Sequence, residues 1–289
     1  MPTPALPRVA GDWSLLFAPS RFGHYVNDHS MVLGQDGLWH LFGITSHAKS
    51  EFSEQERYFV HGATPSLDQP MAELGKVCDN GVRAWAPAVI EHDGRYFMYY
   101  GPSPTRFATS DELGHWMENT IHFHAAPLDA AHRDHFVLKV AENHWLLYAT
   151  GIHRRCGVIS VFESHDLVNW TFLRYALRTT PAAPLRAPWG ATESPFVVLK
   201  EGLYYLFITY TDCSYSNYHD TLVFVSPDPT DFGSYEGGES GDRYLAKLHA
   251  HAPEIILHKG QWHITTCGWR GRGAPIEGAV AIARLSWET

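Results

Sequence analysis

Apolar and polar positions along the chain recur in five segments that share one pattern. Each segment begins with a short apolar run, passes through a turn of small and polar residues, and continues into a second run that is rich in aromatic residues. The segments are 27–43, 85–101, 133–150, 193–209 and 251–268. Two short apolar runs on either side of a turn predict a β-hairpin in each segment.

The five hairpins can be aligned on a turn residue, which glycine or asparagine occupies because a tight turn needs a positive φ. These turn residues are Gly37, Gly94, Asn143, Gly202 and Gly260. An aromatic residue follows each of them two positions later, and we expect this stripe to form core between neighbouring repeats. We also expect the position nine residues before each turn to be structurally equivalent in all five repeats. That position holds Asp28, Trp85, Asp134, Glu193 and His251.

A second, weaker signature follows the hairpins and predicts an outer strand with its turn. Residues 108–117 and 162–171 carry a serine, an aspartate, a leucine and a tryptophan in the same order, and residues 225–233 are a looser copy. The turns recur every 49 to 59 residues, without a long helical period. This repeat predicts an all-β chain, a five-bladed β-propeller of four-stranded blades. Two packed β-sandwiches are the alternative.

The whole chain, residues 1–289, is accommodated by this single propeller domain. Residues 12–19 near the start and 279–288 at the end each read as a strand. We expect these two strands to close the ring by sharing a blade, since no hairpin repeat covers either of them.

Composition excludes several classes of function. The chain has 289 residues, 45% of them apolar, and carries 22 Lys and Arg against 31 Asp and Glu, a net charge of −9. An acidic chain without a run of Lys or Arg is not expected to bind nucleic acid or a membrane. Four widely spaced cysteines predict free thiols, not a disulfide scaffold or zinc knuckle. No apolar stretch has signal-peptide or membrane-spanning length, so we expect a cytoplasmic protein.

The aligned position carries a carboxylate in three of the five repeats: Asp28, Asp134 and Glu193. Acidic residues are disfavoured in strands and costly to bury, so packing does not explain three of them at one repeat position. The first strand of a blade begins near the propeller axis, where the three would converge. Paired carboxylates are the usual apparatus of glycoside hydrolysis. Ligation of a structural cation, or capping of turns, is the alternative interpretation.

These residues resemble the motifs of the five-bladed propeller glycosidases of families 32, 43, 62, 68 and 117. The resemblance implies that Asp28 is the nucleophile or base, that Asp134 is a transition-state stabiliser or pKa modulator, and that Glu193 is the general acid. Trp85-Ala-Pro resembles the second-blade motif of family 43, whereas Asn27-Asp28 and Arg133-Asp134 look more like family 32. Family 32 enzymes add a C-terminal β-sandwich, which we do not expect here.

The same motifs nominate substrate and metal contacts. Those expected to bind substrate are Asn27, His29, Trp85, Arg133, His135 and Trp269. His251 falls where family 43 often has a histidine near an axial metal ion, so a structural Ca²⁺ or Na⁺ is allowed there, although no cofactor is required. Glu254 is a rival to Glu193 as the acid. Arg154 and Arg270 are expected at the rim.

Together these features predict a glycoside hydrolase that acts on an oligosaccharide or glycoside. The resemblance implies a small, furanosidic sugar at the non-reducing end, as in arabinofuranosidases, xylosidases or fructosidases. A transglycosylase of the same architecture and a non-catalytic carbohydrate-binding propeller are the alternatives. The second alternative needs no proton donor opposite a base.

Overall fold

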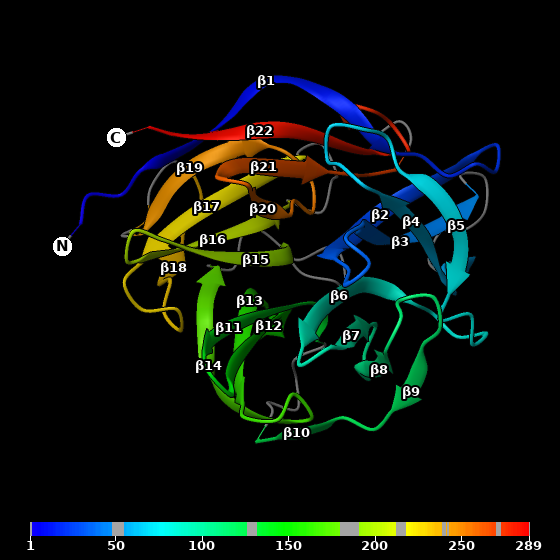
Figure 1. The fold of residues 1–289 in the computed structure, drawn as a ribbon. Helices are drawn as coiled ribbons and strands as arrows, with labels where there is room; N and C mark the ends of the chain where they lie inside the picture. The colour runs from blue at the N-terminus through cyan, green and yellow to red at the C-terminus, as the bar shows by residue number, and fades with distance from the viewer. Residues whose placement is uncertain are drawn as a thin grey trace.

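The computed structural model describes residues 2–47, 55–125, 132–179, 191–211, 218–238, 241, 243–269 and 273–288. The elements of these residues are β-strands, labelled β1 to β22, and they form five sheets around a central axis (Figure 1). The all-β class and the five-bladed propeller are therefore confirmed, and the alternative of two sandwiches is wrong.

Blades 1 and 2 each consist of four antiparallel strands. Blade 1 consists of β2 (His24–Leu33), β3 (Trp39–His47), β4 (Phe59–Thr64) and β5 (Ala72–Val77). Blade 2 consists of β6 (Trp85–His92), β7 (Arg95–Gly101), β8 (Arg106–Ser110) and β9 (Met117–Asn119).

Blades 3 and 4 follow the same order, and blade 3 gains two short outer strands. Blade 3 consists of β11 (Arg133–Ala141), β12 (His144–His153), β13 (Cys156–Ser164) and β14 (Asn169–Thr179), with β10 (His122–His124) and β18 (Ser234–Tyr235) parallel to β14. Blade 4 consists of β15 (Thr192–Lys200), β16 (Leu203–Tyr210), β17 (Asp220–Ser226) and β19 (Tyr244–His249).

Blade 5 joins the two ends of the chain. Its strands are β20 (Ile255–His258), β21 (Gln261–Thr266), β22 (Val280–Glu288) and β1 (Leu6–Phe17). The first strand pairs with the last along most of its length, and Figure 1 shows them side by side at the outer edge of the ring. The expected sharing of a blade by the two terminal strands is confirmed.

The aromatic stripe after the turns packs between blades, as predicted. Trp39 joins a cluster that contains Val280 and Ile282 of blade 5, and Tyr96 joins one that contains Phe42 of blade 1. Trp145 packs with Ala88 and Tyr99 of blade 2. Burial of these large rings supplies much of the apolar area that holds neighbouring blades together.

The outer-strand signature also has a local cause. Ser110 and Ser164 each accept a hydrogen bond from the backbone N–H three residues ahead, at 2.9 Å, where Leu113 and Leu167 have positive φ. These serines therefore fix matching turns in blades 2 and 3.

Two expectations from composition can be checked on the described residues. Cys78, Cys156 and Cys267 are free thiols, whereas Cys213 lies outside the described part of the chain. Among the described residues, no helix has the length and apolar character needed to cross a membrane.

Candidate active site

In blades 1 to 4 the first strand contains one residue in the left-handed region, in blade 5 such a residue lies three positions before β20, and these five residues surround the axis. They are Asp28, Ala86, Asp134, Ser194 and Ala252, with φ between 44° and 52°. In blades 1 to 4 the strand pairing shifts at this point, which makes each a β-bulge. Bulges and positive φ at non-glycine residues are costly, and they concentrate at functional sites because they re-aim side chains.

The bulges correct the alignment made from the turns. Asp28 and Asp134 occupy the bulge, but Trp85, Glu193 and His251 lie one residue before it and are equivalent to Asn27 and Arg133. Blades 2, 4 and 5 have two-residue turns with both residues at positive φ. Blade 1 instead has a five-residue turn between Leu33 and Trp39, and blade 3 has a second register shift before its turn, so both have one more residue between the bulge and the aligned turn residue. Counting nine residues back from the turn therefore reaches the residue with positive φ in blades 1 and 3 and the residue before it in blades 2, 4 and 5.

The three predicted carboxylates nevertheless come together, and Ser194 links two of them. The Ser194 hydroxyl donates to Asp28 Oδ1 at 2.6 Å, and the Ser194 backbone N–H donates to Asp134 Oδ2 at 3.2 Å. The bulge at Ser194 therefore points a backbone donor at blade 3 and a side-chain donor at blade 1.

Arg133 links the third carboxylate to the cluster. Its Nη2 donates to Glu193 Oε1 at 3.2 Å, and its Nε lies 3.5 Å from Asp134 Oδ2. His251 is fully buried, and its Nε2 lies 3.9 Å from Glu193 Oε2. The Glu193 side chain, 13% exposed, thus lies between an arginine and a histidine.

These contacts distribute protons unevenly over the carboxyls. Burial raises the pKa of Asp28, and burial together with the charges of Asp28 and Glu193 raises the pKa of Asp134 to about 7. Burial would also raise the pKa of Glu193, but His251 and Arg133 outweigh it and hold this pKa below its ordinary value. Repulsion from the two aspartates alone would raise the pKa of Glu193, but the direct contacts with His251 and Arg133 keep it low.

Aromatic and amide side chains form one wall of the site. Asn27 Nδ2 donates to Asp28 Oδ2 at 3.2 Å and to the Tyr218 hydroxyl at 3.4 Å. The Tyr218 ring stacks between His251 and Trp269, with ring centroids 4.1 and 5.0 Å away. Asn27 thus lies beside Asp28 and Trp269 packs against Tyr218, and substrate binding by both residues stays a prediction.

Glu56 is a residue that the sequence reasoning missed. Its side chain accepts a hydrogen bond from the Tyr25 hydroxyl at 2.7 Å, and it lies beside the indoles of Trp269 and Trp85. Burial and the charge of Asp28 raise its pKa to about 7. A fourth carboxyl therefore lies beside both tryptophans of the wall. Its position just before β4, outside the hairpin repeat, left no periodic signal for it.

His29 and His135, the two histidines predicted to contact substrate, lie next to the carboxylates in an axial cavity. His29 and His135 line a cavity of about 270 Å³ whose lining also includes Asp28 and Asp134. His29 Nε2 hydrogen bonds Thr265 and His135 Nε2 hydrogen bonds Thr105, at 2.7 and 2.9 Å. Burial lowers the pKa of both imidazoles to about 3, so both are neutral at neutral pH.

Glu254 lies in the same cavity. The Met31 N–H donates to Glu254 Oε2 at 2.8 Å, and burial raises the pKa of this carboxyl to about 8. Met31 is three residues along β2 from Asp28, so Glu254 is separated from the acid cluster by roughly 10 Å of strand.

The nitrogen of His251 faces Glu193, not a set of oxygen ligands of the kind that Ca²⁺ prefers. Within the described ranges, no group of three His, Cys, Asp or Glu ligand atoms gathers around His251. The axial cation therefore stays a prediction. Of the two expected rim arginines, Arg154 is exposed in the turn after β12, and Arg270 lies outside the described residues.

Comparisons with known proteins support the fold. No protein-family model and no curated protein matches the sequence. A thermostable family 43 glycoside hydrolase is similar in structure, with 14% identity and a TM-score of 0.66, over 94% of this chain and 93% of that one. An α-L-arabinofuranosidase from Clostridium thermocellum has 17% identity and a TM-score of 0.59, over 89% and 88% of the two chains.

A Bombyx mori family 32 β-fructofuranosidase, solved with sucrose, is also similar, with 15% identity and a TM-score of 0.62. It is matched over 94% of this chain, which spans only 60% of the length of that enzyme. The resemblance to five-bladed propeller glycoside hydrolases is thus confirmed at the level of the fold.

Proposed function

We propose that this protein is a glycoside hydrolase that releases a furanosidic sugar from the non-reducing end of an oligosaccharide or glycoside. The observation that carries the proposal is the meeting of three carboxyls from blades 1, 3 and 4 around Ser194 and Arg133. A fold shared with glycoside hydrolases of families 32 and 43 supports it.

In this proposal Asp28 attacks the anomeric carbon or activates a water there, and Glu193 protonates the leaving oxygen. Asp134 steadies the positive charge that develops on the sugar ring. Trp85 and Trp269, which lie beside Glu56, give the sugar an apolar wall.

Glu193 must carry a proton to act as the acid, yet Arg133 favours its ionised form in the free protein. We infer that a sugar hydroxyl takes over donors of Arg133 when the substrate binds. The pKa of Glu193 then rises, and the proton held by the pair Asp28 and Asp134 becomes available to it.

The test is a panel of arabinofuranosides, fructans, xylosides and their nitrophenyl analogues, with proton NMR following the first anomer released. Release of a terminal furanose supports the proposal, and the configuration of that product distinguishes a nucleophilic Asp28 from a basic one. Binding without turnover would overturn the proposal in favour of a carbohydrate-binding propeller. Transfer to a sugar in preference to water would identify a transglycosylase.

A further inference from the structure

A cluster of His144, Glu163 and His165 lies on blade 3, far from the candidate active site. Strand β11 starts at Arg133 in the acid cluster and ends at Ala141, so its nine residues span roughly 30 Å. His144 begins the next strand, Glu163 lies near the end of β13, and His165 follows directly after that strand. The cluster therefore occupies the opposite face of the propeller.

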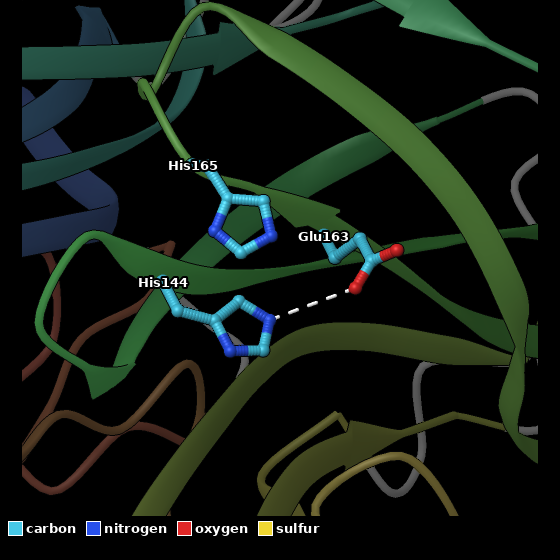
Figure 2. Close-up of side chains that lie close together, drawn as sticks. All are labelled: His144, Glu163 and His165. Atoms are coloured by element: carbon cyan, nitrogen blue, oxygen red, sulfur yellow. Dashed lines mark ion pairs between the residues drawn. The ribbon is translucent and has the colours of Figure 1, made fainter.

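The three side chains point toward one another, as Figure 2 shows. His144 Nε2 lies 3.6 Å from Glu163 Oε2, and the two imidazole rings stack with centroids 4.7 Å apart. One ligand atom from each residue lies within 4.8 Å of the other two. In the described part of the chain, this is the one group of three or more His, Cys, Asp and Glu residues that is so compact.

Two details orient the imidazoles as metal ligands. His165 Nδ1 lies 2.7 Å from the Asn143 carbonyl oxygen, which can only accept, so Nδ1 carries the proton and Nε2 keeps its lone pair. A hydrogen bond of this kind to the outer nitrogen is the usual support of a metal-bound histidine. His144 Nε2 is shielded from solvent and has no hydrogen-bond partner.

In blade 2 the positions equivalent to His144 and His165 form an ordinary ion pair. The pairing of β7 with β8 makes Arg95 and Asp111 the equivalents of His144 and His165, and they form a salt bridge at 3.4 Å. Blade 3 replaces this attraction with two stacked imidazoles, which gain nothing from each other's charge. A bound cation would supply the attraction that these two imidazoles lack.

We propose that His144, Glu163 and His165 bind a divalent transition-metal ion, with Zn²⁺ the best match. Two imidazoles and one carboxylate are the ligand set of a three-residue zinc site, with water in the fourth position. Imidazole nitrogens argue against Ca²⁺ and Mg²⁺, which prefer oxygen. The ion would tie the β11–β12 turn to the β13–β14 turn.

The proposal is tested by titrating the whole protein with ZnCl₂ in a calorimeter and by recording Co²⁺ absorption spectra. We expect one zinc equivalent, a tetrahedral Co²⁺ spectrum, and a rise of a few degrees in Tm with zinc. His144→Ala and His165→Ala should each lose all three effects.

Two further variants control the test. His115→Ala removes an exposed histidine at the matching turn of blade 2 and should bind zinc as the wild type does. The double variant His144→Arg with His165→Asp copies the ion pair of blade 2, so it should fold stably without zinc and bind none. Equal zinc binding by the wild type and this double variant, or no binding by the wild type, would overturn the proposal. Neither outcome bears on glycoside hydrolysis.

Discussion

Arg133 governs the electrostatics of the acid cluster at the scale of single residues. It contacts Glu193 and lies beside Asp134, and its side chain is only 10% exposed. A buried guanidinium is always charged, so it fixes which of the neighbouring carboxyls is ionised. Glu193 contacts both His251 and Arg133, which hold its pKa low in the free protein, and substrate must change these contacts before acid catalysis can begin.

Replacing Glu193 with Gln should separate its role as an acid from that of Asp28. The amide keeps a hydrogen-bond acceptor for Arg133 but cannot donate a proton to the leaving oxygen. We expect natural glycosides to be hydrolysed ~10²–10⁴-fold more slowly, because general acid catalysis typically contributes that much. Nitrophenyl glycosides leave without protonation and should be affected far less.

The control is Glu254→Gln, which changes a buried carboxyl outside the acid cluster and should treat both substrate types alike. Steady-state kcat/KM on the paired substrates is the measurement. If Glu254→Gln showed the selective loss and Glu193→Gln did not, the acid would have been assigned to the wrong residue.

Asp28, Asp134 and Glu193 could be predicted from sequence, because carboxylates are disfavoured in strands and these three recur at nearly the same position of the repeat. Glu56 and Tyr218 could not, although both lie in the same site. They precede outer strands in connections whose length differs from blade to blade, so no repeat marks them. Their proximity to the acids arises only when the blades close around the axis.

The unit that builds the site at the scale of elements is the bulge in the first strand of blades 1 to 4. A residue at positive φ turns consecutive side chains and a backbone N–H toward the axis, which a regular strand would point to alternate faces. Hairpins could be predicted from sequence, but the bulges could not. Turn residues can be identified because they are Gly or Asn, whereas Asp, Ala and Ser occupy the bulges and do not mark a positive φ in a sequence.

Removing the Ser194 hydroxyl should change how Asp28 ionises. Its hydrogen bond lowers the pKa of Asp28, so Ser194→Ala should raise that pKa further. The acidic limb of the kcat/KM profile should move to higher pH, with a loss of about tenfold on that limb, because each 1.4 kcal/mol is a factor of ten. A pH series of kcat/KM on one natural substrate measures the effect.

Ser194→Gly is the matched variant, because glycine also lacks the hydroxyl but adopts a positive φ without strain. Both variants should shift the profile equally. A shift with alanine alone would mean that backbone geometry, and not the hydroxyl, is responsible.

At the scale of the whole molecule, the propeller gathers buried carboxyls along its axis, and stability must respond to pH. Glu254 is 9% exposed, and its pKa rises from 4.5 to about 8 on folding. The folded state therefore holds this proton more tightly than the unfolded state. Its contribution to stability is fully present below pH 4.5 and is lost as the pH rises toward 8.

The free energy of unfolding of Glu254→Gln, relative to that of the wild type, should therefore increase as the pH rises. The neutral amide can still accept the Met31 N–H but has no proton to lose. Urea unfolding at pH 5 and pH 9 should show the variant gaining on the order of 4 kcal/mol relative to the wild type. Glu142→Gln, at an exposed position, should show no such trend. Parallel pH curves for the wild type and Glu254→Gln would contradict the assignment.

Closure of the ring depends on β1, which completes blade 5 and also packs against blade 1. Leu16 is fully buried in a cluster with Val26 and Leu41, whereas its neighbour Leu15 is 41% exposed. Leu16→Ala should lower the free energy of unfolding by about 2–5 kcal/mol, the usual cost of a buried leucine truncation, and Leu15→Ala by less than about 1 kcal/mol. Urea unfolding of both variants is the measurement.

Both strand pairing and the inter-blade core are lost if β1 detaches, so Leu16→Ala should lower the midpoint of a single transition. A separate early transition in that variant, with the main one unchanged, would mean that β1 is only an appendage to a ring already closed without it.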